Sequence, residues 1–287
     1  MSTNTQDIAG IGAPRVDEAL AARPRKKRDI SVRWIALTAV ASLVGLYLIL
    51  PTLLIIPMSF SDSSSLGRIS GHWTLKWYQE LVEKKDWARA AGVSLQVAAL
   101  STILATVLGT AATFGLFKLS PRVRAFMQGT SMAPLIIPPV IIGIGVYILM
   151  LKLGLFGTLQ SLVIGHAVLS IPFVIVAVST SLAQFDPSQE QAAAILGARP
   201  WTRFRRVVFP QILPGIVAGA LFAFVTSWDE VVVSTFLVSP NFRTLPVEMW
   251  IQARTTVTPV LAALSTVLMV VSTLALVGMF RLQRTRK

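Results

Sequence analysis

Six long apolar stretches dominate this sequence and limit the folds that it can adopt. A helix of about 20 apolar residues crosses the hydrocarbon core of a membrane, and it satisfies its own backbone hydrogen bonds where no water can do so. The sequence therefore predicts an all-α, polytopic membrane protein with six transmembrane helices. The predicted spans fall at about 34–58, 93–117, 132–150, 162–182, 212–237 and 260–280.

Composition excludes several other classes of protein. Hydrophobic residues make up 54% of the chain and charged residues only 14%, whereas a soluble domain has about 25% charged residues. The chain has no cysteine, which excludes disulfide frameworks and thiol catalysis. Its two histidines, His72 and His166, are not at the spacing of metal ligands, so we expect no metal site.

The uneven distribution of positive charge predicts the orientation in the membrane. The formal net charge is +13, and 18 of the 26 Lys and Arg residues lie at the two termini and in alternate connections. Cytoplasmic loops are enriched in these residues. Both termini are therefore expected in the cytoplasm, with the chain crossing the membrane several times. The basic cluster at 25–28 is expected to contact anionic membrane lipid rather than nucleic acid.

The connections suggest how the chain is organised. A signal peptide is the competing interpretation of the N-terminal region, but its apolar stretch is longer than a typical signal sequence and no A-x-A-like site follows it. We expect a mobile basic cytoplasmic tail at 1–29, a first transmembrane helix at 30–58, an external loop at 59–91, a five-helix core at 92–281 and a cytoplasmic tail at 282–287.

The external loop is rich in aromatic residues. Trp73, Trp77, Tyr78 and Trp87 lie in it among mixed charges. Such a segment beside a span is typical of an interfacial belt. A docking surface for an external partner is the alternative.

The connection at 184–210 has the pattern of two short helices joined by a tight turn. Asp186 is placed to cap the first helix, and Gly197 suits a left-handed stop. A second helix, basic and amphipathic, is expected from residue 200, ended by Pro210 and Pro214 before the fifth span. Such a knob could lie on lipid headgroups or fit a groove on a cytoplasmic protein, and physical chemistry alone does not decide between the two.

The same connection resembles the EAA loop in permease subunits of type I ABC importers. It departs from that pattern at two positions. The glutamate of the family motif is replaced by Gln191, although Glu190 directly precedes it, and Ile195 stands where the family often has an acid. The resemblance covers about residues 90–281 and implies the type I ABC importer permease fold. The matching residues are Ala192, Ala193, Gly197, Ala198, Phe204, Pro210 and Pro214.

This resemblance implies a multi-pass transport subunit of the bacterial cytoplasmic (inner) membrane rather than an enzyme, with no catalytic residue and no cofactor of its own. In the family, the loop forms a coupling helix that sits in a groove on an ATPase subunit. The implied partners are a second permease subunit (as a heterodimer), two cytoplasmic ATPase subunits that bind ATP and Mg²⁺, and an external or periplasmic solute-binding protein. This sequence accordingly contains no G-x-x-x-x-G-K-[ST] phosphate loop. The implied coupling residues are Glu190, Gln191, Ala192, Ala193, Gly197, Ala198, Arg203, Phe204 and Pro210.

The fifth stretch contains two adjacent acids, Asp229 and Glu230, which is unusual within an apolar run. An ionised acid at the centre of a membrane costs about 2.5–3.5 kcal/mol on insertion scales, so the pair is expected to face a cavity or another span. One interpretation is structural, with an acid paired to a basic residue of a neighbouring span. The other places Thr226, Ser227, Trp228 and both acids in a substrate path that attracts a cation.

A second resemblance bears on the solute. The segments 227–233 and 244–247 are similar to the second permease subunit of spermidine/putrescine importers, as is 132–139. The resemblance implies import of a polyamine or a related small cation. Import of another small organic solute, secondary transport driven by an ion gradient, and a membrane scaffold are the alternatives, although we find no internal repeat typical of secondary transporters.

His166 is expected at the start of the fourth span. We interpret it as a histidine satisfied by a neighbouring carbonyl, with a proton relay as the alternative.

Overall fold

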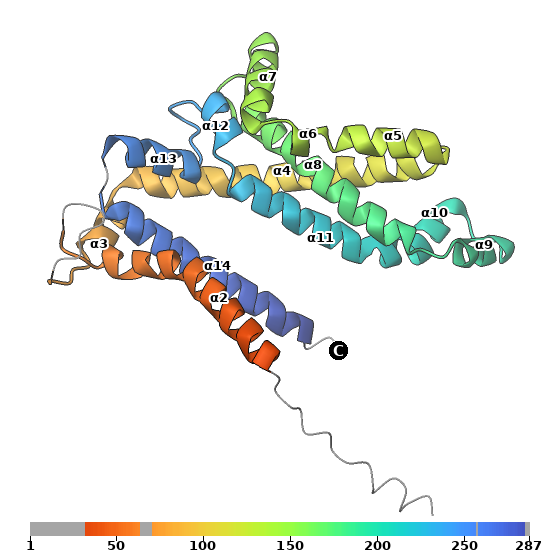
Figure 1. Cartoon of the computed structure of the whole chain (residues 1–287). Coiled ribbons are helices and arrows are strands. Elements are labelled where there is room, and N and C mark those ends of the chain that lie inside the picture. Colours follow the sequence, from red (N-terminus) through yellow and green to blue (C-terminus); the bar gives the residue numbers. More distant parts are fainter. Residues whose placement is uncertain (1–31, 64–70, 257, 285–287) are drawn as a thin grey trace, which may run out of the picture. The chain divides into compact units, whose positions relative to one another are not determined.

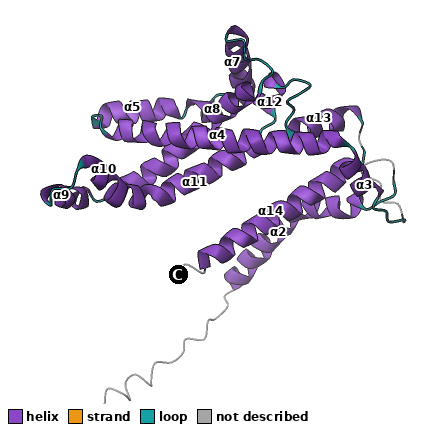
Figure 2. Cartoon of the chain, turned by 180° about the vertical axis from the view of Figure 1, so that it is seen from behind, coloured by secondary structure: helices purple, strands orange, loops and turns teal. Residues whose placement is uncertain are grey.

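The structure is a computed structural model, and it describes residues 32–63, 71–256 and 258–284. The described residues form helices joined by loops and turns (Figure 2). Among them, the β structure is limited to one isolated bridge between Ser61 and Trp73. The predicted all-α class is therefore confirmed.

The chain divides into two compact units, and each is described by itself. The first ends at Leu53 and the second begins at Leu54. Helix α2, Val32–Ser59, starts in the first unit and corresponds to the first predicted span. The tail predicted at 1–29 lies outside the described residues.

Three long helices pack side by side at the centre of the second unit (Figure 1). Small residues let their backbones approach closely, as is usual between helices in membranes. Gly109 and Gly219 both face Val174: an added Cβ would lie 2.8 Å from the Val174 Cβ and 3.0 Å from its Cα, respectively. The three helices are α4 (Lys85–Phe117), α8 (Leu159–Ala183) and α11 (Phe209–Trp228).

Shorter helices connect these three or flank them, and one longer helix follows. They are α3 (Lys76–Glu83), α5 (Pro121–Ser131), α6 (Ala133–Ile136), α7 (Pro139–Lys152), α9 (Pro187–Ile195), α10 (Pro200–Arg203), the π-helix η1 (Phe204–Val208), α12 (Val232–Leu237), α13 (Leu245–Thr255) and α14 (Val260–Arg284).

The predicted count of six spans is only partly reproduced. Among the described residues, four helical segments are long and apolar enough to cross a membrane: Trp34–Ser59, Lys85–Phe117, Leu159–Ala183 and Pro200–Trp228. The count of six is reached only by adding two shorter apolar helices, Pro139–Lys152 and Val260–Thr273.

The third predicted span is not one continuous helix. Helix α6 ends at Ile136, and α7 begins only at Pro139. Ile137 and Pro138 between them have extended backbones. Proline cannot donate a backbone hydrogen bond, and it disfavours helix at the residue before it. The two adjacent prolines therefore separate the helices.

The fifth predicted span differs at both ends. It begins upstream, because α10, η1 and α11 form one continuous helical path from Pro200. The Phe209 amide bonds the Phe204 carbonyl five residues back, and Pro210 and Pro214 lie within this path instead of ending a separate helix. The π-turn accommodates Pro210, which has no N–H to donate. At the other end the helix stops at Trp228, so the acidic pair does not lie within a helix.

The prediction that the aromatic residues of the external loop form an interfacial belt is wrong for two of them, Trp77 and Trp87. Trp77 and Trp87 are buried and pack in a core with residues of α13 and α14. The Trp77 indole N–H also donates to the Ser61 carbonyl at 2.8 Å. Only Trp73 of the three tryptophans is exposed.

Candidate functional site

The 184–210 loop begins with the predicted helix cap. The Asp186 carboxylate accepts hydrogen bonds from the Ser188 amide at 2.9 Å and from the Ser188 hydroxyl at 2.7 Å. These bonds, the hydroxyl first, lower the pKa of the Asp186 carboxyl, because they favour its charged form. Pro187 occupies the first turn of α9, where a missing N–H has no cost.

The turn that ends α9 is also as predicted. Gly197 has a φ of +80°, a left-handed conformation that glycine adopts without a steric penalty. Its amide donates to the Ala194 carbonyl and the Ala198 amide donates to the Ala193 carbonyl, both at 3.0 Å. This pair of bonds is a Schellman motif. It reverses the chain between α9 and α10.

Aromatic and polar contacts join the loop to the long helices. The Phe204 ring lies 5.4 Å from the ring of Phe114 on α4 and 5.7 Å from the ring of Trp201. The Gln211 side chain of α11 donates to the Gln189 side chain of α9 at 2.6 Å. These contacts join the loop to both α4 and α11.

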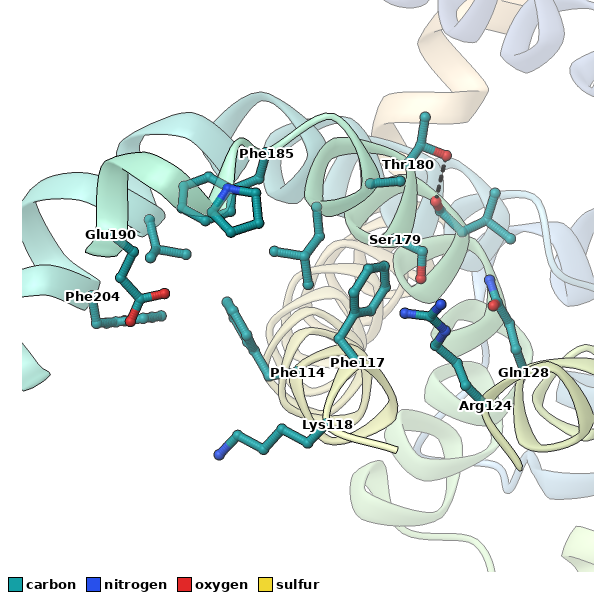
Figure 3. A pocket seen from close by; sticks show the side chains of 15 residues that line it. Phe114, Phe117, Lys118, Arg124, Gln128, Ser179, Thr180, Phe185, Glu190 and Phe204 are labelled. Atoms are coloured by element: carbon teal, nitrogen blue, oxygen red, sulfur yellow. Dashed lines mark hydrogen bonds between the residues drawn. The ribbon is translucent and has the colours of Figure 1, made fainter. Parts of the chain in front are cut away.

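Residues of the loop also line a pocket of about 1160 Å³ (Figure 3). Phe114 and Phe117 come from α4, Arg124 from α5, and Glu190 and Phe204 from the loop. Glu190 lies 3.9 Å from the Arg203 guanidinium, too far for a hydrogen bond but within range of an ion pair. The predicted coupling residues therefore lie on both arms of the loop, and two of them, Glu190 and Phe204, line this pocket.

The apex of the loop exposes large apolar side chains. Ile195 and Leu196 are each 87% exposed, and Trp201 is 68% exposed. They lie on either side of the Gly197 turn. In water these side chains would lose the free energy of burial, about 1.5–3 kcal/mol each. An exposed apolar cluster of this kind typically marks a contact with another molecule.

The acidic pair lies at the opposite end of α11, in a helix break formed by Asp229–Val231. The Glu230 carboxylate accepts hydrogen bonds from the amides of Val233 and Ser234, both at 2.8 Å. It therefore satisfies amides at the start of α12 that would otherwise lack acceptors. Glu230 is only 8% exposed, and these contacts favour its structural interpretation.

A buried polar network surrounds this break, and His166 lies at its centre. Its Nδ1 lies 2.8 Å from the Ser227 hydroxyl and its Nε2 lies 2.7 Å from the Ser234 hydroxyl. Its Nε2 is also 3.8 Å from the Glu230 carboxylate. The Ser101 hydroxyl of α4 donates to Ser227 at 2.9 Å. We call these five side chains the His166 network.

The predicted environment of His166 is thus wrong in two respects. The residue lies inside α8 rather than at its start, and its ring contacts serine side chains rather than a carbonyl. No local pattern could have revealed this, because Ser227 and Ser234 are 61 and 68 residues away in the sequence.

Asp229 points the other way from Glu230. It is exposed and lines a pocket of about 350 Å³ together with Trp228, Met249 and Trp250. Within the described residues, Asp229 makes no ion pair. A carboxylate beside an aromatic ring can hold a cation through charge attraction and cation–π contacts. The Arg254 guanidinium already lies 4.4 Å from the centre of the Trp250 ring, so Trp228 is the ring considered for such a contact. Trp250, on α13, was not singled out from the sequence, because only the fold brings it to Asp229.

The five residues predicted for the substrate path are therefore separated by the break. Trp228 and Asp229 line the pocket, whereas Ser227 and Glu230 are buried and bonded within the His166 network. Thr226 is half-buried. Their part in transport stays a prediction.

Comparison with known proteins agrees with this architecture. The spermidine/putrescine transport system permease protein PotC of Escherichia coli K12 is 32% identical over 226 residues, covering 79% of this chain and 85% of that protein. The putrescine transport system permease protein PotI of the same strain is 33% identical over 234 residues, covering 78% and 82%.

A solved structure shares the fold at much lower identity. It is the crystal structure of a bacterial ABC transporter involved in the import of the acidic polysaccharide alginate. The similarity has a TM-score of 0.69 at 14% identity, and it covers 91% of this chain and 99% of that one.

A family model decides the classification. Residues 86–287 match the model that describes the inner membrane component of binding-protein-dependent transport systems. The match includes α4, α8 and α11, the 184–210 loop and the helix break. This chain therefore belongs to the family of inner membrane components of binding-protein-dependent transport systems, and it is a transport subunit rather than an enzyme.

Proposed function

We propose that this chain is the permease subunit of an ATP-driven importer whose solute is a polyamine, such as spermidine or putrescine. The observation that carries the choice of solute is the exposed Asp229 carboxylate, which lines a pocket with Trp228 and Trp250 and makes no ion pair within the described residues. A polyamine carries ammonium groups joined by apolar methylene chains. It therefore suits a site that combines a carboxylate with aromatic walls.

The fold alone does not select this solute. The solved relative imports an acidic polysaccharide with the same fold, and a polyanion would be repelled by Asp229. PotC and PotI, which are 32% and 33% identical to this chain, are permease proteins of spermidine/putrescine and putrescine transport systems. The chemistry of the pocket and the names of these relatives support the same class of solute.

The 184–210 loop is proposed to bind a groove on an ATPase subunit. The exposed Ile195, Leu196 and Trp201 supply an apolar contact surface, and the Gly197 turn fixes its shape. Phe204 and Gln211 would pass the movement of the ATPase to α4 and α11. In this proposal the loop and both termini lie in the cytoplasm, in accord with the bias of Lys and Arg.

The partners follow from this assignment. Two ATPase subunits would bind ATP and Mg²⁺, and this chain would bind no cofactor. A second permease subunit would complete the pathway across the inner membrane. A solute-binding protein would deliver the polyamine to the outer face.

The test is uptake by the complete transporter reconstituted in proteoliposomes, with radiolabelled spermidine and putrescine. We expect uptake that requires ATP and the solute-binding protein and that persists when a protonophore abolishes the proton gradient. Uptake that stops with the gradient while ATP remains would indicate a secondary transporter.

Asp229→Asn tests the solute site in the same assay. Because the variant removes the charge and keeps the side-chain size, we expect the KM for spermidine to rise about tenfold, the equivalent of about 1.4 kcal/mol. Asp86→Asn is the matched control, since Asp86 is an exposed acid in the first turn of α4 and lies outside the pocket. An unchanged KM in Asp229→Asn would remove Asp229 from the substrate path.

A further inference from the structure

We infer that His166 is a positioning residue for solute transport: its imidazole clamps the two helices on either side of the break and so holds Asp229 in the pocket. The inference rests on the proposed function, which places Asp229 in the substrate path. His166 itself does not line that pocket.

The clamp spans the break directly. Nδ1 contacts Ser227 in the last turn of α11, and Nε2 contacts Ser234 in the first turn of α12. Asp229 lies between these two serines in the sequence. One rigid ring on α8 therefore fixes both ends of the short segment that carries the exposed carboxylate.

The neighbouring hydrogen bonds fit a neutral state of the ring. When the Ser101 proton lies on the Ser227 oxygen rather than on the Ala98 carbonyl 3.2 Å away, the Ser227 proton is left for Nδ1. Ser234 donates to the Glu230 carbonyl at 3.2 Å, which leaves the Ser234 oxygen to accept a proton from Nε2. A neutral imidazole with its proton on Nε2 satisfies every step of this chain.

Burial makes the clamp strong and local. His166 is 1% exposed, and Ser101 and Ser234 are fully buried. A polar group left without its partner in such a place is destabilising. We therefore expect the geometry of the break to change when the imidazole is removed. The side chains that face the ring are Ser227, Ser234 and Glu230.

The same interface provides a matched control. The single proton of the Ser170 hydroxyl, one turn along α8, is shared between the His166 carbonyl at 2.8 Å and the Ala223 carbonyl of α11 at 3.3 Å. Ser170 is also fully buried. Ser170→Ala thus removes a buried bond between the same two helices without touching the break.

The first experiment is a double-mutant cycle on the KM of the reconstituted transporter for spermidine. His166→Phe keeps a ring and removes both bonds, and we expect the KM to rise about tenfold. In the Asp229→Asn background, we expect less than a twofold further rise, because the carboxylate that the clamp positions is already absent. Ser170→Ala should leave the KM within twofold of wild type. Equal rises in both backgrounds would overturn the inference.

A second variant covers the case in which His166→Phe does not assemble. Ser234→Ala removes one arm of the clamp and keeps the imidazole, and we expect the same pattern with about a threefold rise in KM. A Ser234→Ala transporter whose KM is unchanged would also overturn the inference.

Amide hydrogen exchange separates this inference from the assignment of Asp229. We expect His166→Phe, or Ser234→Ala in its place, to increase exchange at residues 229–234, and Ser170→Ala to leave that segment unchanged. If Asp229→Asn has a normal KM but the clamp variants still increase exchange, the substrate path is wrong and the clamp stands. If exchange in that segment is unchanged, the clamp itself is wrong.

Discussion

Helix α11 meets an irregular segment at each end, and the two segments are built in opposite ways. At its N-terminal end, the 184–210 loop exposes Ile195, Leu196 and Trp201. At its C-terminal end, the break is surrounded by buried polar side chains that bond one another, such as His166 with Ser227 and Ser234. The apolar side chains of the loop are exposed, whereas the polar groups of the break form hydrogen bonds within the chain.

This difference indicates what each segment requires. The exposed apolar side chains of the loop would gain free energy from burial against another molecule, which is the contact proposed for the ATPase subunit. The break is held by hydrogen bonds within this chain, and in the proposed function it keeps the Asp229 carboxylate in place. Changes at the break should therefore lower the stability of this chain, and changes at the loop should affect coupling and leave its stability almost intact.

The largest effect is expected at the break, for Glu230→Ala. The buried amides of Val233 and Ser234 would lose their acceptors, at about 1–3 kcal/mol each. We expect a clear fall in the melting temperature of the purified transporter, measured by thermal unfolding in detergent. Glu230→Gln keeps one oxygen acceptor and should lose less. A normal melting temperature in Glu230→Ala would remove the contrast between the two segments.

Gly197→Val at the loop should have a smaller effect of a different kind. A left-handed conformation costs a β-branched residue about 1–2 kcal/mol, and the space around Gly197 is open, so the backbone alone is strained. We expect fewer polyamine molecules transported per ATP hydrolysed, with the melting temperature almost unchanged.

Gly129→Val is the control for this change. Gly129 on α5 has equally open surroundings and no positive φ. If Gly197→Val and Gly129→Val both transport as many polyamine molecules per ATP hydrolysed as the wild type, the Gly197 turn has no role in coupling.

The smallest effect is expected at Asp186. Its folded pKa lies below the ordinary value, so the stabilisation from its cap is fully present above about pH 4, the usual pKa of Asp, and is lost as the pH falls through the lowered value. The protection factor of the Ser188 amide should therefore stay constant from pH 8 to pH 5 and fall only in more acidic buffer. In Asp186→Asn, which has no titrating group, this acid-dependent fall should be absent; a fall of the same size would assign it to another group.

The local features of the loop could be predicted because they depend on neighbouring residues. The Asp186 cap and the Gly197 turn each involve amides and carbonyls within five positions in the sequence. The helix across 162–182 was equally accessible, since its apolar length alone requires it, and it is confirmed as α8. The family resemblance also rests on residues of this loop, such as Gly197 and Phe204.

The break and its network could not be predicted in this way. The run from 212 to 237 is apolar enough to suggest one helix, and the sequence gives no sign that Glu230 bonds the amides of α12. The contact between Ser101 and Ser227 joins residues 126 positions apart. Such contacts depend on how α4, α8 and α11 pack.

A helical membrane protein with a capped loop that turns at a glycine could be predicted from the amino-acid sequence, because apolar length, caps and turns are governed by chemistry within a few residues. Which acid faces a pocket and which is buried depends on the packing of the helices, and so do the contact of His166 with the break and the position of Trp250 in the pocket beside Asp229. The physical reason is that a buried polar group must find its partner in space, and the packing of distant helices determines which partner that is.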